Sequence, residues 1–87
     1  MKSFESLYAE VGAKKAAGDP NSGSVKALKE GRHFIGKKLT EEAAESWMAA
    51  EHEGKERAAE ELSQLIYWSI LMMHALDIAP EDVYKHL

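Results

Sequence analysis

Two acidic segments, 41–45 and 60–64, most constrain how this chain can fold, because in each a glutamate falls on the apolar face of a predicted helix. If residues 25–52 form one helix that turns by about 100° per residue, Glu42 shares an arc with five apolar residues: Leu28, Ile35, Leu39, Ala43 and Ala50. Glu61 shares an arc with apolar residues of a second helix, predicted from 55 to 77: Leu65, Trp68 and Met72. The sequence therefore predicts two carboxylates that point into a helical fold.

Carboxylates that converge in this way need something to neutralise them. An ionised acid in a dry interior is costly, so it must be protonated, paired with a base or bound to a metal ion. Lys38 and Glu45 lie at the border of the apolar arc, and Glu41 lies further toward water. Mg²⁺ takes oxygen ligands and is commonly shared between protein carboxylates and substrate phosphates. The pattern thus predicts a phosphate-handling magnesium site, with a merely solvent-facing acidic surface as the plain alternative.

The rest of the chain predicts an all-α fold: a short N-terminal helix, two long antiparallel helices and a short C-terminal helix in a bundle. Ser3 is expected to cap the first helix, and Ser24 to cap the second after the turn-rich segment 18–24. Gly31 and Gly36 weaken the second helix enough to permit a break. Strand-like alternation and glycine-rich phosphate-loop motifs are absent from the sequence.

The apolar segment from 61 to 76 bears on oligomeric state. Eighty-seven residues suffice for one small domain, predicted over 1–87, but bury only a limited core. A helix that is apolar on nearly every side needs more neighbours than so short a chain supplies. We therefore expect a homodimer, in which paired long helices of two chains form the bundle and the acids occupy a cleft. Trp47, at the edge of the apolar arc, is expected in the core or the interface.

Composition excludes several functional classes. The chain has no cysteine, so a disulfide framework and Cys-ligated zinc are excluded, and its four histidines lack close ligand spacing. A net charge of −4 argues against a nucleic-acid-binding protein, which needs a basic face. No segment is expected to act as a signal peptide or to span a membrane, so the predicted location is cytoplasmic.

The two acidic segments resemble the signature of the all-α nucleotide pyrophosphohydrolases of the MazG-like superfamily, which is E-x-x-E, a spacer, then E-x-x-D. Glu42-x-x-Glu45 and Glu61-x-x-Gln64 occupy those places. Within the superfamily, the sequence is most similar to the phosphoribosyl-ATP pyrophosphohydrolase family. The similarity covers most of the chain: Ser22-Gly23-Ser24, Lys38 followed by Glu41-Glu42-Ala43-x-Glu45, Glu61-x-x-x-Leu65-Ile66-Tyr67, and Pro80-Glu81-Asp82-Val83-Tyr84-x-x-Leu87.

The resemblance implies an enzyme of the second step of histidine biosynthesis, which hydrolyses the nucleotide phosphoribosyl-ATP to phosphoribosyl-AMP and pyrophosphate. It implies that Mg²⁺ polarises the triphosphate while a water, activated by the metal or oriented by a carboxylate, attacks. Lys38 and Ser24 are then expected to contact substrate phosphates. The implied metal ligands are four acids, of which the last three are also the implied catalytic residues: Glu41, Glu42, Glu45 and Glu61.

The sequence departs from the family pattern at three positions. Gln64 stands where Asp is usual, Phe34 where Arg is common, and Thr40 where Gly is common. Gln64 is expected to be either a weak metal ligand or, as we favour, a residue that hydrogen-bonds to and orients Glu61 or Glu45. The general base, the number of metal ions and the substrate selectivity stay open. Two alternative functions are a house-cleaning nucleoside triphosphate pyrophosphatase and a non-enzymatic helical dimer that serves as a binding module.

Overall fold

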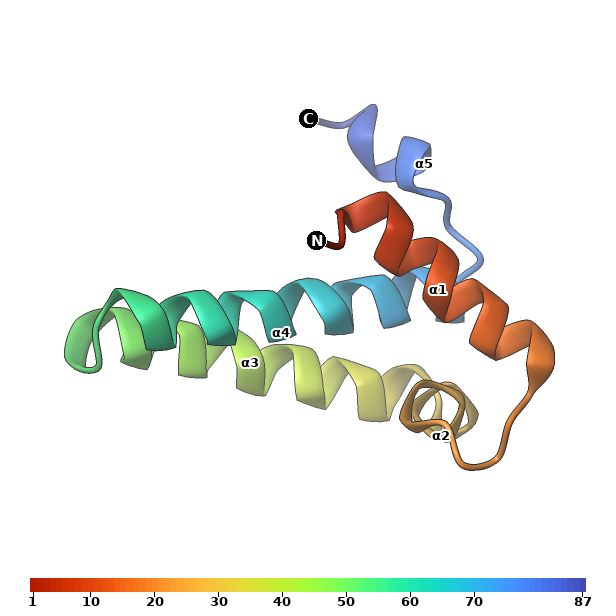
Figure 1. Ribbon diagram of the computed structural model, residues 1–87, viewed down its shortest axis with the longest axis horizontal. Coiled ribbons are helices and arrows are strands. Elements are labelled where there is room, and N and C mark those ends of the chain that lie inside the picture. Colours follow the sequence, from red (N-terminus) through yellow and green to blue (C-terminus); the bar gives the residue numbers. More distant parts are fainter.

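The computed structural model describes all residues from Met1 to Leu87 and contains five helices and no strand. These helices are α1 (Phe4–Ala17), α2 (Gly23–Glu30), α3 (Arg32–His52), α4 (Lys55–Ala75) and α5 (Pro80–Tyr84). The long helices α3 and α4 run antiparallel as a hairpin, while α1 crosses the C-terminal half of α4 and α2 lies at the start of α3 (Figure 1). The predicted all-α fold is confirmed. None of the helices combines the length and the apolar character that a membrane span requires.

The predicted second helix is divided at Gly31 into α2 and α3. Gly31 has a φ of 98°, in the left-handed region that glycine adopts without a Cβ clash. Gly36, the other predicted breaking point, lies inside α3, where an added Cβ would be 3.7 Å from Met72 Cε. The chain therefore has one helix more than the four that the sequence predicted, because glycine ends a helix most readily where the backbone adopts a positive φ.

The buried face of α3 passes through Glu42 but not through the alanines predicted beside it. Ile35, Ser46 and Ala49 are the buried residues of α3, whereas Ala43 and Ala50 are exposed, so that part of the predicted arc is wrong. The small Ser46 fits against α4 because its hydroxyl is satisfied locally, donating to the Glu42 carbonyl at 2.7 Å. A serine on the contact face could not be recognised as buried from its residue type alone.

Of the two serines predicted to cap helices, only Ser3 does so. Ser3 caps α1 as predicted, and its side chain accepts the Ser6 N–H. The cap predicted at Ser24 is wrong, because Ser22 caps α2 by accepting the Val25 N–H. Ser24 is buried instead, and its hydroxyl lies 2.5 Å from the Tyr67 hydroxyl on α4. This hydrogen bond ties the start of α2 to the middle of the hairpin.

The core lies between α1, α2, the start of α3 and the C-terminal half of α4, and it is centred on five residues: Val11, Ala27, Ile35, Ile70 and Leu71. The N-terminal half of α4 is not covered in this way: Leu62 in that half and Ile66 just past the middle of the helix are 49% and 45% exposed. Trp47 is 70% exposed, so it is not part of this chain's own core. The distal half of the hairpin thus projects beyond the other helices (Figure 1).

Candidate active site

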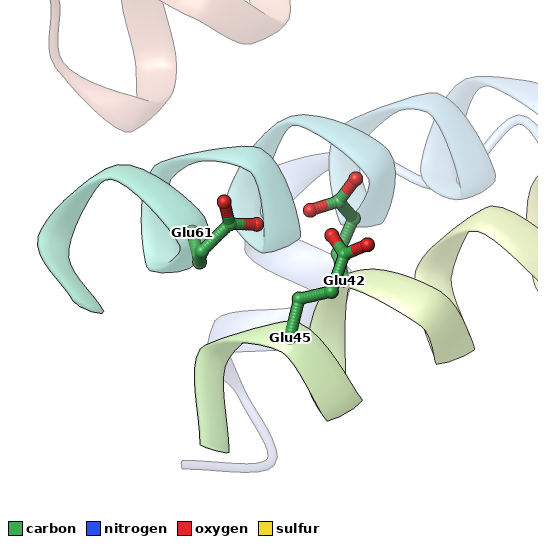
Figure 2. A group of neighbouring side chains, drawn as sticks. All are labelled: Glu42, Glu45 and Glu61. Atoms are coloured by element: carbon green, nitrogen blue, oxygen red, sulfur yellow. The ribbon is translucent and has the colours of Figure 1, made fainter. Parts of the chain in front are cut away.

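The predicted acids converge in the distal half of the α3–α4 hairpin. Glu42 and Glu45 lie one turn apart on α3 and extend toward Glu61 on α4 (Figure 2). One carboxylate oxygen from each residue lies within 4.8 Å of the other two. Residues that are three or four apart share a helix face, so the spacing of the first pair and the antiparallel packing are sufficient to gather the three acids.

Glu42 is the most confined of the three acids. Its Oε2 atom is buried and has no hydrogen-bond partner. Burial, together with the neighbouring Glu61 and Glu45 carboxylates, raises the pKa of Glu42 from 4.5 to about 7. A buried oxygen without a partner is costly in a folded protein. Binding of a proton or a cation would therefore stabilise the Glu42 carboxylate.

The geometry of the three acids suits a small divalent cation. Adjacent oxygen ligands of one octahedral Mg²⁺ ion lie about 3.0 Å apart, because each is about 2.1 Å from the metal. The oxygens of Glu42, Glu45 and Glu61 all lie within 4.8 Å of one another, so they need to draw together by at most about 2 Å to share one ion. Glu45 is exposed and can make that adjustment by side-chain rotation. The unpartnered Glu42 oxygen would then gain a ligand bond.

Glu41, the fourth acid predicted to bind metal, is not part of this group. It is exposed on α3, and its Oε2 lies 3.6 Å from Lys38 Nζ. The Nζ atom of Lys38 also lies 5.9 Å from the centre of the Phe34 ring. Phe34 is the residue that stands where the family commonly has arginine. The structure thus places Lys38 one turn before Glu42 on α3, as the sequence predicted, and pairs it with Glu41 rather than with the converging acids.

Gln64 and Ser24 also lie outside the group of three acids. Gln64 is exposed and faces the start of α1 across a hollow of about 490 Å³ that also contains Lys2 and Tyr67. No side-chain hydrogen bond joins Gln64 to Glu45 or to Glu61. Ser24, at the start of α2, is hydrogen-bonded to Tyr67. The roles predicted for Gln64 and Ser24 in binding metal or substrate stay predictions.

Arg57 is a charged neighbour of the acids that the sequence analysis missed. It lies one turn before Glu61 on α4, and its Nη2 donates to Glu61 Oε1 at 3.1 Å. The signal was present in the sequence, since a basic residue four positions from an acid on a helix pairs with it readily. The apolar arc does not include Arg57, because this residue is exposed.

Comparison with known proteins agrees with the resemblance based on the acidic segments. The family described as "Phosphoribosyl-ATP pyrophosphohydrolase" matches residues 4–87. A protein of Salinibacter ruber named phosphoribosyl-ATP pyrophosphatase is 59% identical over 87 residues, covering 100% of both chains. Proteins of the same name from Bifidobacterium animalis subsp. lactis and Bifidobacterium adolescentis are 55% and 54% identical, also with 100% coverage of both chains. The chain belongs to the phosphoribosyl-ATP pyrophosphohydrolase family.

Proposed function

We propose that this chain hydrolyses phosphoribosyl-ATP to phosphoribosyl-AMP and pyrophosphate, the second step of histidine biosynthesis, and that it requires Mg²⁺. Family membership and the names of the full-length relatives support the reaction. The observation that carries the metal requirement is the convergence of Glu42, Glu45 and Glu61 around a buried oxygen that has no partner. The proposed substrate derives from ATP, so we propose the cytoplasm as the compartment.

The three converging glutamates would hold the ion. When bound, Mg²⁺ neutralises phosphate oxygens and polarises the phosphorus–oxygen bond that is broken. Glu42 supplies the confined, fixed ligand, whereas the exposed Glu45 adjusts to the position of the ion and the substrate. Lys38, one turn away on α3, supplies a positive charge toward substrate phosphates, and Glu41 orients its ammonium group. Without a cation, the three carboxylates would repel a triphosphate.

We also propose that the protein acts as a homodimer through the distal half of the hairpin. Trp47 and Met48 on α3 and Leu62 and Ile66 on α4 are all large apolar residues that are more than 40% exposed. Exposed apolar groups on both long helices are typical of an interaction surface. A second hairpin on this surface would complete a four-helix bundle and cover the neighbourhood of the acids.

The proposal is tested by measuring pyrophosphate release from phosphoribosyl-ATP with and without Mg²⁺. We expect release only with the metal and little from ordinary nucleoside triphosphates, with Glu42→Gln as the inactive control. Faster release from nucleoside triphosphates than from phosphoribosyl-ATP would identify a house-cleaning pyrophosphatase instead. A protein that neither binds Mg²⁺ nor releases pyrophosphate would be the non-enzymatic binding module.

A further inference from the structure

We infer that Arg57 is a substrate-binding residue whose guanidinium contacts the pyrophosphate portion of the substrate. This inference rests on the proposed function. In the metal-free chain, Arg57 donates from Nε to Glu53 at 3.4 Å, from Nη1 to Glu60 at 2.7 Å and from Nη2 to Glu61 at 3.1 Å. Arg57 therefore contacts one of the three converging acids directly.

The position of Arg57 gives it access to a bound phosphate. Its side chain is 49% exposed and lines a hollow of about 230 Å³ together with Glu45, Glu61, Met48 and Glu53. This hollow lies at the end of the hairpin, between α3 and α4 and next to the turn that joins them. Two of the three converging acids thus share one open space with a guanidinium.

Lys38 and Arg57 lie on opposite sides of the converging acids. Lys38 precedes Glu42 by one turn on α3, and Arg57 precedes Glu61 by one turn on α4. The helices α3 and α4 run antiparallel (Figure 1). Their bounds therefore place Lys38 on the core side of the acids and Arg57 on the side of the hairpin turn. A triphosphate on a metal ion held between them would have a positive charge at each end. The pyrophosphate portion carries most of the negative charge. We assign it to Arg57 and not to Lys38, because a guanidinium binds phosphate through two parallel hydrogen bonds.

The chemistry of the arginine suits this role better than a purely structural one. A guanidinium has five N–H donors, and the three contacts with acids leave two of them unused. Its planar fork matches a phosphate in two parallel hydrogen bonds. If the Glu61 carboxylate turned to a bound metal ion, a further donor of Arg57 would be released. Glu61 therefore holds Arg57 in place in the metal-free chain, and the guanidinium would then be free to bind the phosphate.

Calorimetric titration tests this inference with two probes, Mg²⁺ alone and inorganic pyrophosphate in the presence of Mg²⁺. The variants are Arg57→Gln, Arg57→Lys and Glu60→Gln, and the thermal midpoint of each is recorded. Glu60 forms the shortest bond to Arg57 but is not one of the converging acids, so it is the matched control. We expect Arg57→Gln to weaken pyrophosphate binding on the order of tenfold, as loss of a charge-assisted hydrogen bond does. Arg57→Lys, which keeps the charge without the fork, should be intermediate.

Affinity for Mg²⁺ separates this role from simple positioning of Glu61. If Arg57 competes with the ion for Glu61, Arg57→Gln should bind Mg²⁺ as well as the wild type or more tightly, while it loses pyrophosphate affinity. Glu60→Gln should keep its pyrophosphate affinity within about twofold, as expected for an exposed pair. Weaker Mg²⁺ binding by Arg57→Gln would make Arg57 a positioning residue and overturn the inference.

Two further results would also overturn it: a lower thermal midpoint with unchanged pyrophosphate affinity in Arg57→Gln, or no pyrophosphate binding by the wild type. The proposed substrate is tested separately. A wild-type protein that binds pyrophosphate through Arg57 but does not hydrolyse phosphoribosyl-ATP would refute the substrate and leave the role of Arg57 intact.

Discussion

Replacing Glu42 by glutamine should stabilise the metal-free protein while removing its activity. The folded state holds the Glu42 proton more firmly than the unfolded chain, because the pKa of Glu42 is raised from 4.5 to about 7. The protonated group therefore stabilises the fold fully below pH 4.5, and this stability is lost as the pH rises through 7. Glutamine cannot ionise, so the variant should avoid the loss.

The size of the effect follows from the shift in pKa. A change from 4.5 to about 7 would correspond to roughly 3 kcal/mol for a group shielded from water. Glu45 is exposed, and solvent screens part of its repulsion, so we expect about 1–2 kcal/mol above pH 7. The advantage of Glu42→Gln over the wild type should shrink toward zero at pH 4. Glu41→Gln, at the exposed neighbouring position, should change the free energy of unfolding by less than about 0.5 kcal/mol.

Urea unfolding in EDTA at pH 4 and pH 8 measures these differences, at a single protein concentration so that any dimerisation contributes equally. Addition of Mg²⁺ at pH 8 should then stabilise the wild type much more than Glu42→Gln, because the ion binds the folded wild type preferentially. A Glu42→Gln protein that is less stable than the wild type at pH 8 in EDTA would refute the reasoning. That result would mean that the Glu42 carboxylate is already well paired in the metal-free fold.

Three further predictions concern the other residues around the hairpin. Gln64→Asp should leave Mg²⁺ affinity unchanged or weaker in a titration, because Gln64 faces the hollow at the start of α1. Leu62→Glu should convert a dimer into a monomer in sedimentation experiments, because it places a charge on the exposed apolar surface. Tyr67→Phe should lower the free energy of unfolding by about 1–2 kcal/mol, since it leaves the buried Ser24 hydroxyl without its partner.

Each of these three has a clear contrary result. A distinct tightening of Mg²⁺ binding in Gln64→Asp would make position 64 a metal ligand. A wild-type protein that sediments as a monomer at micromolar concentration would rule out the proposed dimer. Unchanged stability in Tyr67→Phe would show that the Ser24 hydroxyl finds another hydrogen-bond partner.

The helices and the converging acids could be predicted from the sequence because each depends on a local period. Glu42 and Glu45 share a face through their spacing alone, and the apolar neighbours of Glu61 set the orientation of α4. The family resemblance added the reaction, which spacing cannot supply. These predictions needed only the assumption that two helices pack along their apolar faces.

The errors lie where a contact between distant segments decided the outcome. Ser22 and Ser24 are both suitable caps by residue type, and the Tyr67 hydroxyl on α4 determines which one is free to cap α2. Similarly, Ala43 and Ser46 do not differ enough in apolar character to fix the rotation of α3, which is set by close packing against α4. Arg57 was missed because its importance depends on acids of α3 that converge on its partner Glu61.

The arrangement of core and acids along the hairpin explains how so small a chain can tolerate an unsatisfied site. The fully buried Ile70 and Leu71 lie in the half of α4 that α1 and α2 cover. The half that carries Glu61 has fewer neighbours, and its acids meet beyond the core. A cation that binds there can draw Glu42, Glu45 and Glu61 together by adjusting side chains in the exposed half. The core that holds the hairpin together does not need to repack, so metal binding can change the site without changing the fold.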